Sequence, residues 1–164
     1  MYKAMKVLAI VVLIVTIAGA GAVLYGIETL SPVVEQVHVA ATPAAQAQDV
    51  FEDLLSQANR QTFTGRVFAQ PGALDAENCT FVTYTVRLSN RGFFPAEWIS
   101  LDIAPVQGDV LQMDNVQANV LPRGSRGDIA ATILHAGDNA AAARTYTIHA
   151  YVLGRKITLE GTAQ

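Results

Sequence analysis

The sequence contains a single cysteine, Cys79, among its 164 residues, so no disulfide can form within the chain. Basic residues are also scarce, since 11 Lys and Arg stand against 14 Asp and Glu for a net charge of −3. This balance argues against nucleic acid as a partner, because binding to phosphate backbones depends on basic patches. Because no internal disulfide is available, the fold must be held by its apolar core, in which a lone thiol usually acts as a small buried hydrophobe.

Residue clusters with the spacing of a catalytic or metal site are also lacking. A dyad of Cys79 with His135 or His149 is the one sulfur–imidazole pairing, and nothing in the sequence brings these side chains together. No glycine-rich phosphate loop joins a strand to a helix. Four aspartates fall in separate predicted turns, where this residue is common: Asp109, Asp114, Asp128 and Asp138. We predict that the protein is not an enzyme and binds no cofactor and no metal.

Charge is absent altogether from residues 7–27, a run of 21 predominantly apolar residues. This length is sufficient for a helix to cross the hydrocarbon core of a bilayer. Lys3 and Lys6 precede the run, and no basic residue follows it until Arg60. Because basic flanks stay in the cytoplasm, we predict a single-pass membrane protein with its N-terminus inside and its C-terminal domain extracellular. The predicted divisions are a cytoplasmic segment at 1–6, a transmembrane signal-anchor at 7–27, a juxtamembrane linker at 28–61 and a folded domain at 62–164.

A cleaved signal peptide is the alternative, because small residues after position 17 offer cleavage sites of the A-x-A type. The apolar run continues beyond those sites, which favours an uncleaved anchor. The same small residues give the helix a flat face around Ala18 and Ala22, where a second membrane helix can pack closely. Simple tolerance of small residues in a membrane helix is the favoured interpretation of this face.

The juxtamembrane region is expected to contain one amphipathic helix at residues 43–60. Thr42 is a suitable N-cap and Pro43 a suitable first residue, and apolar residues then recur at spacings of three and four. The face is too short for a coiled coil, so we expect the helix to pack on the domain that follows or to lead into it. Residues 33–40 read as an extended segment, either a stalk or a first edge strand.

From residue 62 onward the apolar period changes to two, as in half-buried antiparallel strands. The clearest strand is 79–89, in which alternate residues are apolar. Further strands are expected at 62–69, 95–104, 110–113, 116–121, 128–135, 144–153 and 156–161. Short strands at regular spacing, separated by Gly, Pro and Asn turns, predict a mainly β fold: an antiparallel Ig-like β-sandwich of seven to eight strands.

The motifs in this region resemble those of bacterial surface immunoglobulin-like modules of the CARDB type. The resemblance is carried by residues 84–92 with their N-x-G turn, the strand at 96–103, and the P-x-G turn at 122–124 before the strand at 129–134. It covers about residues 63–162 and implies a β-sandwich used for display, adhesion or assembly, with no catalytic residues to carry over. The combination of anchor and small domain is also similar to small uncharacterised exported proteins of Gram-positive bacteria.

The predicted function is therefore binding, adhesion or assembly at the cell envelope. The expected interaction surface consists of outward-facing residues of two strands: Trp98, Thr145, Thr147, His149 and Tyr151. Trp98 has a second interpretation, in which it covers its own sheet, and this is the one that its residue type favours. Two alternative functions remain: an accessory subunit that docks through its transmembrane helix, and a pilin-like subunit, although the peptidase site and helix Glu typical of pilins are missing. The partners are thus a membrane and a protein.

An RGD tripeptide at residues 126–128 falls in a predicted polar loop, where integrin-type recognition would be the functional interpretation. Three residues recur easily by chance, and arginine and glycine are also ordinary turn residues. We therefore predict a structural role for this tripeptide.

Overall fold

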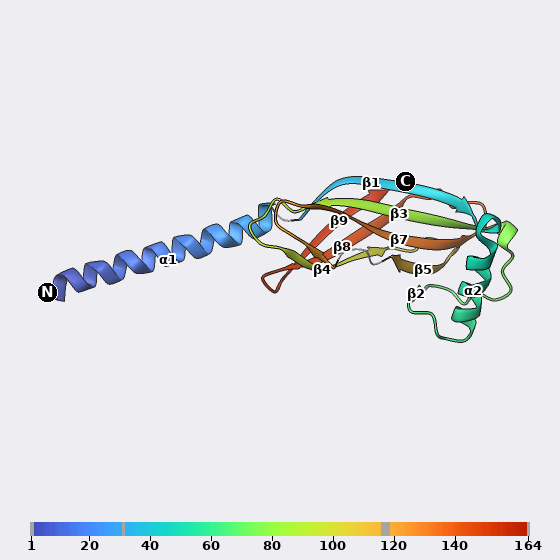
Figure 1. Ribbon diagram of the computed structural model, residues 1–164, viewed down its shortest axis with the longest axis horizontal. Coiled ribbons are helices and arrows are strands. Elements are labelled where there is room, and N and C mark those ends of the chain that lie inside the picture. Colours follow the sequence, from blue (N-terminus) through green and yellow to red (C-terminus); the bar gives the residue numbers. More distant parts are fainter. Residues whose placement is uncertain (1, 31, 116–118, 164) are drawn as a thin grey trace.

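The computed structural model describes residues 2–30, 32–115 and 119–163, and it shows one long helix leading into a β-sandwich (Figure 1). The helix is α1, Tyr2–Leu30. Its segment Leu8–Gly26 is long and apolar enough to cross a membrane, and all of its residues except the last, Gly26, are exposed. This agrees with the length expected from the uncharged run.

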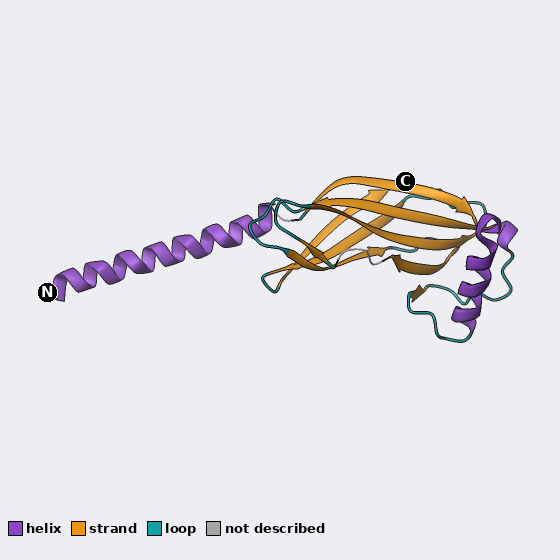
Figure 2. Cartoon of the chain, viewed as in Figure 1, coloured by secondary structure: helices purple, strands orange, loops and turns teal. Residues whose placement is uncertain are grey.

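The sandwich consists of two antiparallel sheets (Figure 2). Together they contain nine strands in the part of the chain that the structure describes. The first sheet has the order β1 (Val33–Pro43), β3 (Cys79–Ser89), β7 (Arg126–Ala136), β5 (Asp109–Asn115) and β2 (Arg66–Val67). The second has the order β6 (Val120–Leu121), β4 (Ala96–Ile103), β8 (Arg144–Val152) and β9 (Arg155–Ala163). The mainly β, antiparallel sandwich predicted from the sequence is thus confirmed, with one or two more strands than expected.

The main core lies between the two sheets and is built from the inward parity of each strand. In β3 the inward residues are Val82, Tyr84, Val86 and Leu88, as the alternation in the sequence predicted. The intervening residues of β3 face the other side of the sheet, where Cys79 and Phe81 enter a second, smaller core. The sheet therefore has apolar contacts on both faces at one of its ends.

The second core is formed where α2, Gln48–Asn59, packs on the outer face of the five-stranded sheet. Phe51 and Leu54 of α2 are buried there beside Phe81 and Leu134 of the sheet. The predicted packing of the amphipathic helix on the domain is confirmed. Its predicted start is wrong, because Thr42 and Pro43 end strand β1 and the 3-10 turn η1, Ala44–Ala47, comes first without a side-chain cap.

Residues 33–43 belong to the sandwich, which corrects the expected boundary at residue 62. β1 pairs with β3 from Val33↔Ser89 to Pro43↔Thr80, so it is an edge strand and not a stalk. The pairing is possible because Val37 and Val39 share the inward parity and pack against the main core. The segment 28–61 is therefore not a linker: it contains the end of α1, a full edge strand and α2.

Two predicted strands are much shorter than expected. Of residues 62–69, only Arg66 and Val67 pair with β5. Just before them, the backbone at Gly65 approaches the carbonyl oxygen of Gln112 so closely that a side chain would not fit there. Of residues 116–121, only Val120–Leu121 is a strand, and 116–118 lie outside the described residues.

Strand direction separates the loops of the sandwich into two groups. β1 begins beside the end of α1, and the registers β1–β3, β3–β7 and β4–β8 then place residues 90–95, 122–125 and the β8–β9 turn at that same end. We call this the basal end. The opposite, distal end carries η1, α2 and residues 60–78, which we call the distal cap (Figure 1).

Candidate interaction surface

Trp98 occupies a break in the β4–β8 ladder. The register shifts between Glu97 and Ser100, so that Glu97 and Trp98 both face outward while Ile99 enters the core. The backbone of Trp98 has a φ of +52°, a conformation that bulky residues rarely adopt. Its side chain is 72% exposed. Trp98 does not cover its own sheet, which corrects the interpretation that its residue type favoured.

The remaining residues of the predicted surface lie on the same side of the four-stranded sheet. Thr145, Thr147, His149 and Tyr151 alternate along β8 with the buried residues of the core. Tyr151 pairs in register with Glu97, the neighbour of Trp98. The structure therefore brings the five predicted residues to one face, with the two aromatic residues toward its basal end.

Charged groups extend this face beyond the predicted residues. Asp102 pairs in register with Thr147, and its carboxylate lies 3.6 Å from Nε2 of His149, the next outward residue of β8. Arg66 donates to the same carboxylate at 3.0 Å. Thr158 Oγ1 of β9 lies 3.4 Å from His149 Nδ1. Asp102 shares the outward parity of β4 with Ser100 and was available to sequence reasoning, whereas Arg66 comes from the other sheet and was not.

The outer face of the five-stranded sheet is a second polar surface. A shallow depression there is lined by Gln36, His38, Thr85, Arg87 and Asp128. Arg87 donates through Nε and Nη2 to the two oxygens of Asp128, each at 2.8 Å. This pairing lowers the pKa of Asp128 and raises that of Arg87. The two charged residues that line the depression thus neutralise each other.

The same ion pair explains the RGD tripeptide. Residues 126–128 form the start of β7 and not the predicted loop, because Arg126, Gly127 and Asp128 pair with Ser89, Leu88 and Arg87 of β3. Asp128 is held by Arg87, and Arg126 Nε donates to Glu35 at 2.8 Å. Both charged side chains therefore have partners within the chain, as the structural interpretation predicted.

The catalytic pairing of Cys79 with histidine is ruled out by geometry. Cys79 points into the second core, while His135 pairs in register with Thr80, and its side chain lies on the opposite face of the sheet. Burial raises the pKa of the Cys79 thiol, which keeps it in its unreactive form. Among the described residues there is also no group of His, Cys, Asp and Glu that could hold a metal ion.

A buried polar cluster was missed by sequence reasoning. Arg144 Nε and Nη2 donate to Asp109 at 2.9 and 2.6 Å, and Arg144 Nη1 donates to the Tyr84 hydroxyl at 3.0 Å. His135 Nδ1 lies 2.8 Å from Asp109 Oδ1. Burial works to raise the pKa of Asp109, but the bonds from Arg144, the Val106 amide and His135 outweigh it, so this pKa lies below its ordinary value.

This cluster corrects the view of Asp109 as a surface turn residue. The side chains of Asp109 and Arg144 are fully buried, and Arg144 also donates to the carbonyls of Ala140 and Ala142. Every strong charge in it is matched, and we see its role as joining the loop before β8 to the two sheets. A partner cannot reach it without opening the distal end.

Comparison with known proteins adds little to this description. No family model matches the chain, and no curated protein matches it. The crystal structure of the GAE domain of yeast GGA1 is similar with a TM-score of 0.41 and 17% identity, over 51% of this chain and 76% of that one. The GAE domain of GGA2p from Saccharomyces cerevisiae gives a TM-score of 0.35 and 8% identity, over 56% of this chain and 91% of that one. Neither likeness carries a functional assignment.

Proposed function

We propose that the protein is a membrane-anchored binding module that holds a protein partner against the outer face of its four-stranded sheet. Trp98 carries this proposal. A non-glycine residue held at positive φ costs on the order of 1–3 kcal/mol, and such strain is concentrated at functional positions. Here the strained position presents a large aromatic side chain to solvent. Exposed tryptophan is the residue type most enriched among the energetic centres of protein interfaces.

The neighbours of Trp98 suit this role. Tyr151 adds a second exposed aromatic ring, and Asp102 with His149 supplies hydrogen-bonding groups beside it. An aromatic centre with a polar margin is the usual composition of a binding surface. We propose no catalytic step, since the functional residues of this face do not include an activated nucleophile.

The anchor is the second component of the proposal. In the candidate span Leu8–Gly26, every residue before Gly26 is exposed. So much exposed apolar surface would be costly in water, whereas in lipid it is the normal state of a helix. Lys3 and Lys6 before the span support a cytoplasmic N-terminus, and the sandwich would then lie outside the cell. The partner would then be an envelope protein.

Position-specific photo-crosslinking in intact cells tests the binding face. A benzoylphenylalanine placed at position 98 or 151 should give a discrete crosslinked product. The matched control is the same residue at His38, which is exposed on the outer face of the other sheet. Equal products at all three positions, or a product at His38 alone, would contradict the proposed face.

A second candidate function is that of an accessory subunit docked through α1. It is favoured by the open surface at the small residues, since a Cβ added at Gly19 or Gly21 would meet nothing within 4 Å. Ala18 and Ala22 flank these glycines one turn apart. Ala18→Leu with Ala22→Leu should abolish co-purification of a membrane partner, whereas Val12→Leu, also in the span, should not.

A further inference from the structure

Three loops at the basal end share an unusual composition. We define the basal tip as residues 90–95, 122–126 and 153–156. These segments contain five basic residues and no acidic one: Arg91, Arg123, Arg126, Arg155 and Lys156. The whole chain carries an acidic net charge of −3, so this concentration of one sign is a local feature of the fold. It cannot be seen along the sequence, because the loops are separated by about thirty residues each.

Hydrogen bonds and strand pairing hold the three loops together. Asn90, fully buried, donates through Nδ2 to the carbonyls of Phe94 and Leu121 at 2.8 and 2.9 Å, and its own carbonyl accepts from the Gly124 amide at 2.8 Å. The β8–β9 turn joins them because β4 pairs with both β6 and β8 near its start. The basal tip is therefore a built surface of one rigid end of the sandwich.

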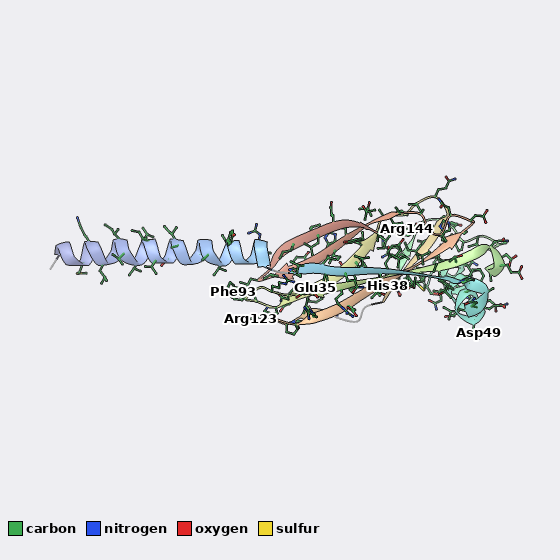
Figure 3. All side chains as sticks on the ribbon, turned by 90° about the horizontal axis from the view of Figure 1, so that it is seen from above. Glu35, His38, Asp49, Phe93, Arg123 and Arg144 are labelled. Carbon is green, nitrogen blue, oxygen red and sulfur yellow. The ribbon has the colours of Figure 1, made fainter. Side chains whose placement is uncertain are left out.

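The contact of Phe93 with α1 shows at which point along the helix the basal tip lies. Gly26 is the last residue of the candidate span, and a Cβ built on it would stand 3.1 Å from Phe93 Cδ2. The Phe93 ring thus packs against the end of the span, although 55% of the residue remains exposed. Figure 3 shows Phe93 and Arg123 beside the end of α1, far from Asp49 on the distal cap. If α1 spans a bilayer, Phe93 lies at the boundary between hydrocarbon and headgroups.

The arginines around Phe93 face solvent. The Arg123 guanidinium lies 5.6 Å from the centroid of the Phe93 ring. Arg91 and Arg126 both reach Glu35, at 3.4 and 2.8 Å, which lowers the pKa of that carboxyl through the bond from Arg126 first. The arginine side chains are nevertheless 63% and 69% exposed, because one carboxylate cannot enclose two guanidinium groups.

The distal end has the opposite charge. Residues 44–78 with the loops 104–108 and 137–143 contain six acidic and two basic residues. Any negatively charged surface would therefore attract the basal tip and repel the distal end. Near such a surface, the charge distribution would turn the basal end of the sandwich toward it. The basal end is also the end to which α1 is attached.

We propose that the basal tip docks on the surface of a membrane that contains anionic lipid, with Phe93 in the interface and the arginines on lipid phosphates. This rests on the proposed function, in which α1 spans the bilayer. Basic residues beside a membrane segment are attracted to anionic headgroups, and aromatic residues prefer the same interfacial layer. The docked sandwich would stand upright and turn the Trp98 face sideways, toward a partner in the same membrane.

The test uses the full chain reconstituted in vesicles, with an indole as the reporter at the tip. Trp98 is the only tryptophan, so Trp98→Phe combined with Phe93→Trp leaves one indole, at position 93. Vesicles of phosphatidylcholine alone are compared with vesicles containing about 30% phosphatidylglycerol, each with lipid brominated in the upper acyl chain. Both leaflets of these vesicles have the same lipid composition, so the expected quenching does not depend on the direction in which the chain inserts.

We expect bromine quenching of this indole to be at least about twofold stronger in the anionic vesicles, and to decline as salt rises toward about 0.5 M. Arg91→Gln, Arg123→Gln and Arg126→Gln together should remove the difference. The matched control removes the same charge elsewhere, through Arg60→Gln, Arg66→Gln and Arg87→Gln, and should keep it.

Flotation and alkaline washing of the same vesicles measure the anchor separately. Chains that stay inserted but are quenched equally in both lipids would overturn the docking and leave the anchor in place. Equal losses in the two triple variants would do the same. A response that depends on the protein-to-lipid ratio, and not on lipid charge, would identify a second copy as the occupant and also overturn it. Chains that do not float with either lipid would overturn the anchor and the docking together.

Discussion

The two ends of the sandwich differ in whether their charged and aromatic side chains are buried or exposed. At the distal end, Asp109 and Arg144 are fully buried and paired, and Phe51 of α2 is enclosed in a second core. At the basal end, arginines stay on the surface and Phe93 remains half exposed against Gly26. The same residue types thus close one end of the fold and leave the other open.

This difference indicates which end of the fold contributes more to stability and which end is available for contacts with other molecules. Buried charges must be matched within the protein, since removing one partner leaves an uncompensated ion. Exposed charges contribute little to stability and are available to an external surface. Variants at the distal end should therefore change unfolding, and variants at the basal end should change only binding.

The largest expected effect is that of Arg144→Met, which removes the buried ion pair that distinguishes the distal end. Asp109 would remain buried without its main partner, at a cost of about 3–5 kcal/mol in the free energy of unfolding. Urea-dependent labelling of the Cys79 thiol measures this, because that thiol is buried until the distal end opens. The double variant Asp109→Leu with Arg144→Met should recover much of the loss. A single variant as stable as wild type would show that the cluster is not structural.

The two phenylalanines sharpen the comparison. Phe51→Ala should lower the free energy of unfolding by about 3 kcal/mol, because the ring is buried in the second core. Phe93→Ala should change it by less than about 0.5 kcal/mol, because much of that ring is already in solvent. The same thiol-labelling assay compares them. Similar losses in both variants would mean that the basal end is as closely packed as the distal end.

Acid should weaken the distal end through Asp109. The pKa of Asp109 is lower in the folded chain than in the unfolded chain, so its contribution is complete above an unfolded pKa of about 3.9 and is lost as the pH falls through the folded value. Stability should therefore decline below about pH 4, with Asp128 and Glu35 acting in the same direction. Asp109→Asn should flatten this dependence, and Asp138→Asn, on an exposed loop, should leave it steep.

The smallest effect is expected for Arg87→Gln. It breaks the ion pair with Asp128 on the outer face of the five-stranded sheet, where both side chains are well exposed to water. The urea midpoint should stay within experimental error of wild type at physiological salt. A clear loss of stability would show that exposed pairs also support this fold, and the contrast between the ends would weaken.

The strands were largely predictable, because alternation in the sequence reports which side of a sheet is buried. It located β3, β4, β7, β8 and β9 and placed the residues of the β8 face together. It did not locate the bulge at Trp98, since a register shift depends on pairing with β8 and leaves the alternation of neighbouring residues almost unchanged.

The charged regions were not predictable from spacing along the chain. Arg60 was the first basic residue after the apolar run, whereas the fold brings Arg91, Arg123 and Arg126 beside the end of α1. Asp109 and Arg144 stand 35 positions apart and each resembles an ordinary turn residue. Both features depend on strand order, which alternation alone does not give.

The attachment of α1 to the edge strand β1 has a mechanical consequence. Residues 33–43 begin just beyond the helix and run away from it along β3, over ten residue pairs with one register shift between Val34 and Gln36. A pull on the anchor, with a partner holding the sandwich, would draw β1 along its own length. The bonds of the β1–β3 ladder would then share the load and would have to fail together instead of one at a time. If α1 spans a bilayer as proposed, the strand that sequence reasoning took for a possible stalk would transmit tension from the membrane directly into the first sheet.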